Sequence, residues 1–124
     1  MEYHITPEQA LMSLRASNDL ESTQLLKLGS LSVRFYSPKG SDLQQPHTRD
    51  EVYVVVSGSA VFRCCDKDLR IASGDVLTVP ARQEHRFVDF TSDFATWVFF
   101  YGPEGGEGKS AECCSGDLTN ITTA

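Results

Sequence analysis

The stretch QQPHTRDEVYVVVSG, from Gln44 to Gly58, sets polar and charged side chains directly against a run of strand-forming residues. Val52–Val56 is typical of a half-buried strand, because β-branched and aromatic residues are enriched in strands. A surface turn would explain the polarity of the preceding residues by itself. The order of the residue types, however, indicates a more specific arrangement.

A histidine and a glutamate in this stretch, His47 and Glu51, are candidates for one metal site. On a straight strand they would lie about 13 Å apart, whereas all ligands of one ion lie about 2.0–2.2 Å from it. Residues 48–50 are polar and compatible with a turn. If the chain reverses there, Glu51 opens a strand antiparallel to one that ends at His47, and both side chains point inward. Gln45 would then share the face of His47.

A second stretch, GDVLTVPARQEHRFVD at 74–89, follows a similar plan. Its pattern predicts a strand that ends at Pro80, a four-residue turn, and a new strand that begins with His85. Both stretches therefore place a histidine next to a strand terminus.

The rest of the chain predicts one helix followed by strands. Thr6, Pro7 and Gln9 form an N-cap, a first-turn proline and a capping-box partner, and the helix should end near 17–18. The predicted strands are Thr23–Leu28, Leu31–Tyr36, Val52–Val56, Ala60–Cys64, Arg70–Ala72, Val76–Val79, His85–Phe90 and Ala95–Tyr101. The turn at 57–59 predicts a hairpin between its two flanking strands. Short, regularly spaced strands indicate a β-sandwich or barrel.

Composition excludes several classes of protein. The chain has 124 residues, enough for one domain, and a net charge of −6, from 17 acidic against 11 basic residues. Scattered cations and an acidic balance argue against nucleic acid as a partner. No apolar stretch is long enough to span a membrane, and the N-terminus does not resemble a secretion signal, so we expect a cytoplasmic protein.

The cysteines come as two adjacent pairs, Cys64–Cys65 and Cys113–Cys114. Neither pair has the spacing of a zinc site or a redox motif. Neighbouring side chains of a strand point to opposite faces, so we expect reduced thiols that bind no metal.

The first stretch resembles one of the two signature motifs of the cupin superfamily, G-x5-H-x-H-x3/4-E-x6-G. His47, Glu51 and Gly58 occupy motif positions. Gln45 stands in place of the first histidine, and Gly40 comes one residue later than the motif requires.

The second stretch resembles the other cupin motif, G-x5-P-x-G-x2-H-x3-N. Gly74, Pro80 and His85 match it, whereas Arg82 replaces the glycine and Asp89 replaces the asparagine. The two motifs occur in the correct order and at the correct separation, which makes the resemblance specific.

The resemblance covers about 31–101 and is greatest to small bacterial single-domain cupins of unassigned activity. It implies an all-β fold, a cupin-type double-stranded β-helix (jelly-roll barrel) with a short N-terminal helix and a flexible C-terminal tail. We therefore expect an N-terminal helix and arm at 1–30 that packs on the barrel, the barrel at 31–102 and a mobile tail at 103–124. Members of the family commonly pair, which predicts a homodimer.

The resemblance also implies one divalent transition metal held by His47, Glu51 and His85, with Gln45 as fourth ligand or close neighbour. Two imidazoles and a carboxylate form the facial arrangement of non-haem Fe(II) sites, so Fe(II) is preferred over Zn, Ni or Mn. Strand alternation from Glu51 places Tyr53 on the inward face, where it is a candidate proton donor beside a catalytic Glu51.

Three functions remain open at this point. The first is a metal-dependent oxygenase or isomerase that acts on a small molecule, with the metal as Lewis acid and template. The second is a non-catalytic cupin that binds or stores a small molecule. The third is a degenerate barrel without metal, which the missing first histidine motivates. One fold hosts many chemistries, so the resemblance does not decide among them.

Overall fold

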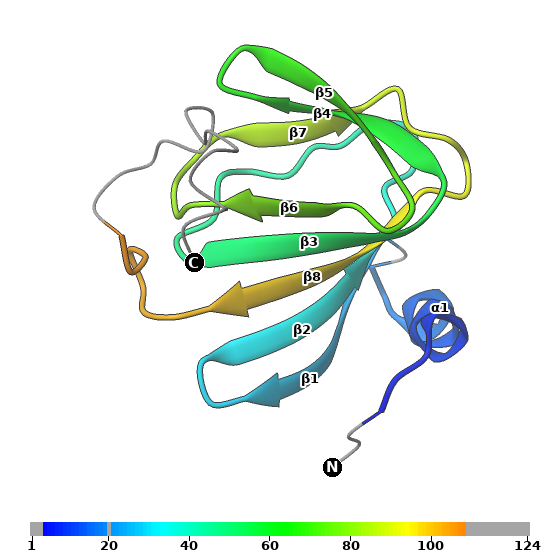
Figure 1. Cartoon of the computed structure of the whole chain (residues 1–124). Coiled ribbons are helices and arrows are strands. Elements are labelled where there is room, and N and C mark those ends of the chain that lie inside the picture. The colour runs from blue at the N-terminus through cyan, green and yellow to red at the C-terminus, as the bar shows by residue number, and fades with distance from the viewer. Residues whose placement is uncertain (1–3, 20, 109–124) are drawn as a thin grey trace.

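The computed structural model describes residues 4–19 and 21–108, and this part of the chain folds into one helix and eight strands (Figure 1). The elements are α1 (Pro7–Ala16), β1 (Ser22–Leu28), β2 (Leu31–Tyr36), β3 (Asp50–Ser57), β4 (Ser59–Cys64), β5 (Lys67–Ala72), β6 (Val76–Val79), β7 (His85–Val88) and β8 (Ala95–Tyr101). The predicted helix and every predicted strand are present, with ends that differ by a few residues. Within the described residues, α1 is far too short to cross a membrane.

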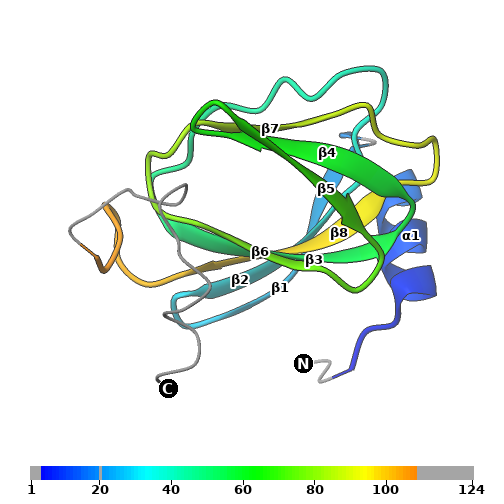
Figure 2. The same ribbon diagram turned by 45° about the horizontal axis from the view of Figure 1, so that its top comes forward.

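The strands form two antiparallel sheets that face each other as a barrel (Figure 2). The larger sheet has the order β1-β2-β8-β3-β6, and the smaller has the order β5-β4-β7. Neighbours in the sheets are mostly distant in sequence, which is the jelly-roll arrangement. The predicted all-β cupin-type fold is therefore confirmed.

The core lies between the sheets and is rich in aromatic rings. Phe87 of β7 is fully buried, and its ring centroid lies 5.0 Å from that of Tyr53 of β3 and 5.0 Å from that of Phe94. Burial of each such side chain stabilises the fold by about 2–3 kcal/mol, and edge-to-face ring contacts add to this. These aromatic side chains pack directly against buried polar residues of the barrel, since the rings of Tyr53 and Phe62 contact that of His85.

Helix α1 covers the outer surface of the larger sheet. The predicted capping box is present, since Gln9 N–H donates to Thr6 Oγ1 (3.1 Å) and Thr6 N–H donates to Gln9 Oε1 (2.9 Å). Ala10 and Leu14 pack with Phe35 in a second, smaller core cluster. The strand β1, which falls within the predicted arm at 1–30, pairs along its length with β2.

The predicted hairpin at 57–59 is wrong. β3 pairs with β6 and β8, whereas β4 pairs with β5 and β7, so the turn carries the chain from one sheet to the other. Gly58 makes this crossing possible, because its φ is 72° and a Cβ there would lie 2.8 Å from Phe94 Cα. A tight glycine turn looks the same in sequence whether or not the flanking strands pair.

The beginning of the predicted mobile tail is held by hydrogen bonds. Gly105 N–H donates to the Thr48 carbonyl at 2.6 Å, and Glu107 N–H donates to Asp50 Oδ2 at 2.9 Å. Residues 103–108 therefore lie against the segment that leads into β3. Residues 109–124 of the predicted tail lie outside the described residues.

The expectation of reduced thiols is wrong for the first cysteine pair. Cys64 and Cys65 are each disulfide-bonded. Their Sγ atoms lie 3.8 Å apart, so they are not bonded to each other. Cys113 and Cys114 lie outside the described residues.

Candidate metal centre

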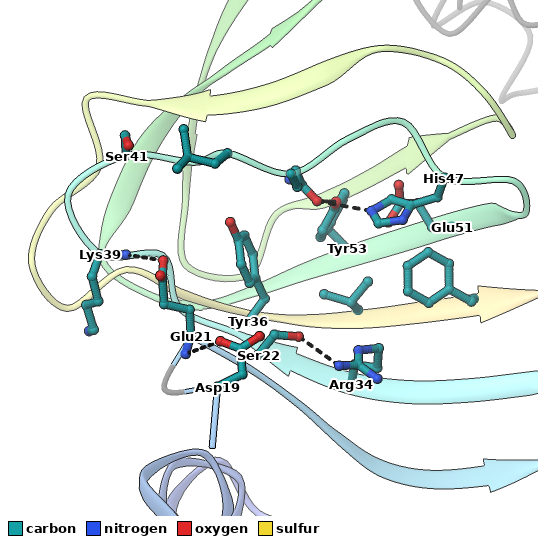
Figure 3. Close-up of a pocket in the computed structure, with 14 residues that line it drawn as sticks. Asp19, Glu21, Ser22, Arg34, Tyr36, Lys39, Ser41, His47, Glu51 and Tyr53 are labelled. Atoms are coloured by element: carbon teal, nitrogen blue, oxygen red, sulfur yellow. Dashed lines mark hydrogen bonds between the residues drawn. The ribbon is translucent and has the colours of Figure 1, made fainter. Parts of the chain in front are cut away.

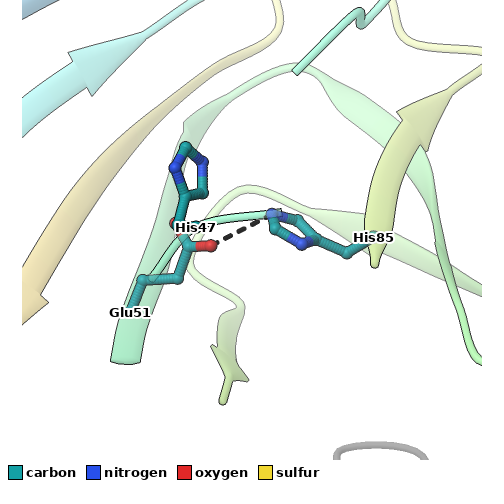
Figure 4. Close-up of side chains that lie close together, drawn as sticks. All are labelled: His47, Glu51 and His85. Atoms are coloured by element: carbon teal, nitrogen blue, oxygen red, sulfur yellow. Dashed lines mark ion pairs between the residues drawn. The ribbon is translucent and has the colours of Figure 1, made fainter. Parts of the chain in front are cut away.

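Two histidines and a glutamate meet inside the barrel (Figure 4). His47 comes from the irregular segment before β3, Glu51 is near the start of β3, and His85 is the first residue of β7. One potential ligand atom from each residue lies within 4.8 Å of the other two. Glu51 and His85 are buried, with exposed fractions of 1% and 4%, and His47 is half-buried. The structure thus brings together three of the four predicted ligands.

Backbone hydrogen bonds fix the segments that carry the two histidines. Arg82 N–H, in the turn before β7, donates to the His47 carbonyl at 2.6 Å. Asp50 Oδ1 accepts from Ala81 N–H of the same turn at 2.8 Å. The start of β3 and the segment before it are therefore tied to the β6–β7 turn at two points. The prediction that a strand ends at His47 is wrong, since 38–49 contain no strand.

The imidazole of His85 presents Nε2 to the site. Its Nδ1 lies 2.9 Å from the Gln83 carbonyl, which can only accept, so Nδ1 carries a proton. Nε2 lies 3.0 Å from Glu51 Oε1. In a neutral His85 ring, the lone pair of Nε2 would face the negatively charged Glu51 Oε1 and be repelled by it. A cation between Nε2 and Oε1 removes this repulsion. Either a proton on His85 or a metal ion satisfies the pair.

Glu51 carries the clearest sign of a missing partner. Its Oε2 atom is buried and makes no hydrogen bond to any described residue. An unsatisfied buried acceptor costs about 1–3 kcal/mol, and more when it is charged. Two donors about 2.1 Å from one ion and at right angles lie about 3 Å apart, which the Glu51–His85 distance fits. The donor set therefore suits a divalent transition metal.

The pKa values of the two histidines shift in opposite directions. Burial lowers the pKa of His85, but the hydrogen bond and the charge of Glu51 outweigh burial, so the pKa of His85 is raised. Burial also lowers the pKa of His47, and there the nearby Glu51 charge does not outweigh it. The metal-free site therefore favours a proton on His85 and a neutral His47, ready to act as a ligand.

The structure places Gln44, and not the predicted Gln45, at the centre. Gln44 Oε1 lies 3.2 Å from His47 Nε2, whereas Gln45 is exposed. The prediction assumed strand alternation, which does not hold here because this segment forms no strand and Pro46 cannot donate to a ladder. Gln44 is thus the amide that can act as a fourth ligand or as a hydrogen-bonding neighbour.

Asp42 holds Gln44 in this orientation, and sequence reasoning missed both residues. Gln44 Nε2 donates to Asp42 Oδ2 at 2.9 Å, which turns Oε1 toward His47. Asp42 is 2% exposed and also accepts from Tyr36 O–H at 2.6 Å and from Phe87 N–H at 2.8 Å. Burial of the Tyr36 ring, and then its hydrogen bond to Asp42, raise the pKa of that phenol strongly. The one available signal was an acid two residues before a glutamine in a loop, and its burial, which the sequence does not show, is what gives Asp42 this role.

Tyr53 points inward as predicted, and its hydroxyl lies at the site. It is 2.9 Å from His85 Nε2 and 3.3 Å from Gln44 Oε1. Complete burial and the neighbouring Glu51 charge hold the pKa of Tyr53 well above its usual value. The phenol therefore stays protonated and can donate one hydrogen bond.

A cavity of about 320 Å³ opens beside the centre (Figure 3). His47, Glu51 and Tyr53 line one part of it, and Arg34 lies in another part. The remaining lining residues are Asp19, Glu21, Ser22, Tyr36, Lys39, Ser41, Leu43, Gln44, Val98 and Phe100. The volume is at the lower end of the range for small-molecule sites.

The fold and the candidate metal centre together point to one family, and comparison with known proteins agrees. The family model for the cupin domain matches 33–101. The chain belongs to the cupin superfamily.

The chain is also similar to an uncharacterized protein and to solved structures. An uncharacterized protein of Streptomyces coelicolor is 38% identical over 73% of this chain and 88% of its own length. The crystal structure of a cupin 2 conserved barrel domain protein from Salinispora arenicola is 19% identical, covers 82% of this chain and 89% of its own, and superposes with a TM-score of 0.60. A chain from the solved structures of the DMSP lyases RdDddP and RnDddQII is 28% identical over 62% of this chain and 41% of its own, with a TM-score of 0.53.

Proposed function

We propose that the protein binds one divalent transition metal through His47, Glu51 and His85 and acts as a metal-dependent enzyme on a small molecule. The observation that carries this proposal is the buried Glu51 carboxylate, which faces an imidazole nitrogen at 3.0 Å while its second oxygen has no partner among the described residues. A cupin that needed no metal would gain stability from a less costly residue at this position. The two-histidine, one-carboxylate set favours Fe(II) over Zn, Ni or Mn.

When bound, such an ion supplies a Lewis acid and leaves positions open for substrate. The residues of the chain itself have separable roles. Gln44, oriented by Asp42, contributes an amide oxygen as a fourth ligand or as a hydrogen-bond acceptor for His47. Tyr53 keeps its proton and donates a hydrogen bond to whichever acceptor atom lies beside His85.

The proposed reaction is an oxygenation or an isomerisation of a small molecule. The cavity is large enough for a small molecule only. The likeness to a DMSP lyase chain supports an enzymatic rather than a storage role. It does not select a reaction, because one fold hosts many chemistries.

The decisive experiment is a turnover screen with the protein reconstituted with Fe(II). We expect O₂ uptake or product formation with at least one compound of a panel of small hydroxylated and aromatic molecules, and none with Glu51→Ala. Metal binding without any turnover would identify a non-catalytic binding cupin instead. The predicted homodimer stays a prediction, and the molar mass in solution, measured by light scattering, will test it.

A further inference from the structure

Arg34 is a cationic side chain on the inner face of the larger sheet. In β2 it stands opposite Val98 of β8, and Val98 stands opposite Tyr53 of β3. Residues opposite each other across a sheet share a face, so Arg34 lies on the same inner row as the buried Tyr53. Two strand spacings separate their backbones by about 10 Å. An arginine at such a position requires an explanation that an exposed arginine does not.

No carboxylate of the described residues pairs with Arg34. Its Nη2 donates to Ser22 Oγ at 3.0 Å, and the ion pairs in this part of the chain involve other residues. The side chain is half-buried. A guanidinium removed from water without an anionic partner loses the charge-assisted hydrogen bonds that it forms best.

Two acids that line the cavity, Glu21 and Asp19, accept hydrogen bonds from the backbone. Glu21 Oε1 accepts from Lys39 N–H at 2.8 Å, and Asp19 Oδ1 accepts from Glu21 N–H at 3.0 Å (Figure 3). Their carboxylates stabilise the turn at the cavity rim. Ser22 Oγ is the acceptor that the described residues provide for Arg34, so its other N–H groups are available to a ligand.

Arg34 and the candidate metal centre open onto the same cavity. Both Arg34 and His47 line the volume of about 320 Å³, with the apolar side chains of Val98 and Phe100 beside them. The cavity thus has one end that carries the Arg34 guanidinium, an apolar wall and a metal-ligating end.

We propose that Arg34 is a specificity-determining residue, which binds the carboxylate of a small organic acid while the other end of that molecule reaches His47 and Glu51. Two parallel N–H···O bonds from the guanidinium suit a carboxylate, and Val98 and Phe100 would contact its carbon skeleton. The part of the proposal that places the other end of the organic acid at His47 and Glu51 rests on the proposed metal function. The carboxylate subsite does not, because Arg34 is not among the candidate metal ligands.

Matched ligand pairs test this proposal. Acetate, propionate, butyrate and benzoate, each compared with its neutral amide, are titrated into metal-free and Co(II)-loaded protein, with binding followed by protein NMR. We expect the best carboxylate to bind about tenfold tighter than its amide, or better, in both forms. Arg34→Gln should abolish this preference, and Arg34→Lys should keep part of it. Arg70→Gln, on the exposed part of β5, is the matched control and should behave as the unmodified protein.

Each outcome separates this proposal from the metal function. A carboxylate preference in protein that binds no Co(II) would support the Arg34 subsite and contradict the metal centre. Equal binding of carboxylates and amides, or an unchanged preference in folded Arg34→Gln protein, would overturn the subsite. Binding of phosphate monoesters in the absence of any carboxylate binding would also overturn it. Circular dichroism of each variant verifies that the barrel is intact.

Discussion

Glu51→Gln is expected to abolish tight metal binding while leaving the metal-free fold nearly as stable. Glu51 is 1% exposed, and its Oε2 has no partner among the described residues, a defect that costs about 1–3 kcal/mol. The substitution removes the buried negative charge, although one amide atom stays unpaired, and it weakens the pair with His85, so the two effects oppose each other. A glutamine amide can still donate to His85 Nε2. We expect the free energy of unfolding of the metal-free protein to fall by no more than about 1 kcal/mol.

Metal binding should respond far more strongly. Loss of a residue that only orients a ligand already costs 10–100-fold in affinity, so loss of the ligand itself should cost about 100-fold or more. At a metal concentration 100 times its dissociation constant, the unmodified protein gains about 2.7 kcal/mol of stability. A 100-fold weaker variant gains only about 0.4 kcal/mol at the same concentration.

Urea unfolding with a chelator and with Co(II) measures both quantities in one assay. Glu84→Gln, at an exposed position next to His85, is the matched control and should change neither. The reasoning fails if Glu51→Gln destabilises the metal-free protein by more than about 3 kcal/mol and retains the Co(II) stabilisation of the unmodified protein.

Three further substitutions probe the frame around the site. Asp42→Asn should lower the free energy of unfolding by about 2–4 kcal/mol and also weaken Co(II) binding. Asp42 accepts hydrogen bonds from Tyr36, Gln44 and Phe87, and the amide group of asparagine would bring a donor against these donors. An unchanged free energy of unfolding would contradict this. Gly58→Ala should lower the free energy of unfolding by about 2 kcal/mol or more, because φ is positive at this position and the added Cβ would clash with the Phe94 backbone. An unchanged midpoint of thermal unfolding would contradict this and show that the turn relaxes. Thr6→Ala removes the N-cap of α1 and should lower the free energy of unfolding by about 1 kcal/mol in the same assay. Co(II) binding should not change, and weaker binding would show that α1 affects the metal centre.

Local signals in the sequence predicted most of the fold. The capping box at Thr6 and Gln9 depends on residues three apart, and it forms as expected. The strands were predictable from short runs of apolar residues, a pattern that depends only on neighbouring positions. The pairing at 57–59 could not be predicted in this way, because it depends on which distant strand lies beside β3. Sheet order is set by the whole barrel.

The candidate metal centre was predictable where a motif fixed the position. His47, Glu51 and His85 lie at motif positions, and the structure brings them together. Gln45 was predicted by alternation, which fails in a segment without a strand. Asp42 was not predicted, because it lies at no motif position and its buried partner Phe87 N–H comes from β7, 45 residues further along the chain.

The most direct test of a metal centre in this barrel is anomalous diffraction at the Co(II) absorption edge, from crystals of the reconstituted protein. We predict a single strong peak bonded to His47, Glu51 and His85, with ligand distances of about 2.0–2.2 Å. A map without a peak among these three side chains, in protein shown to be folded and exposed to excess Co(II), would contradict the account.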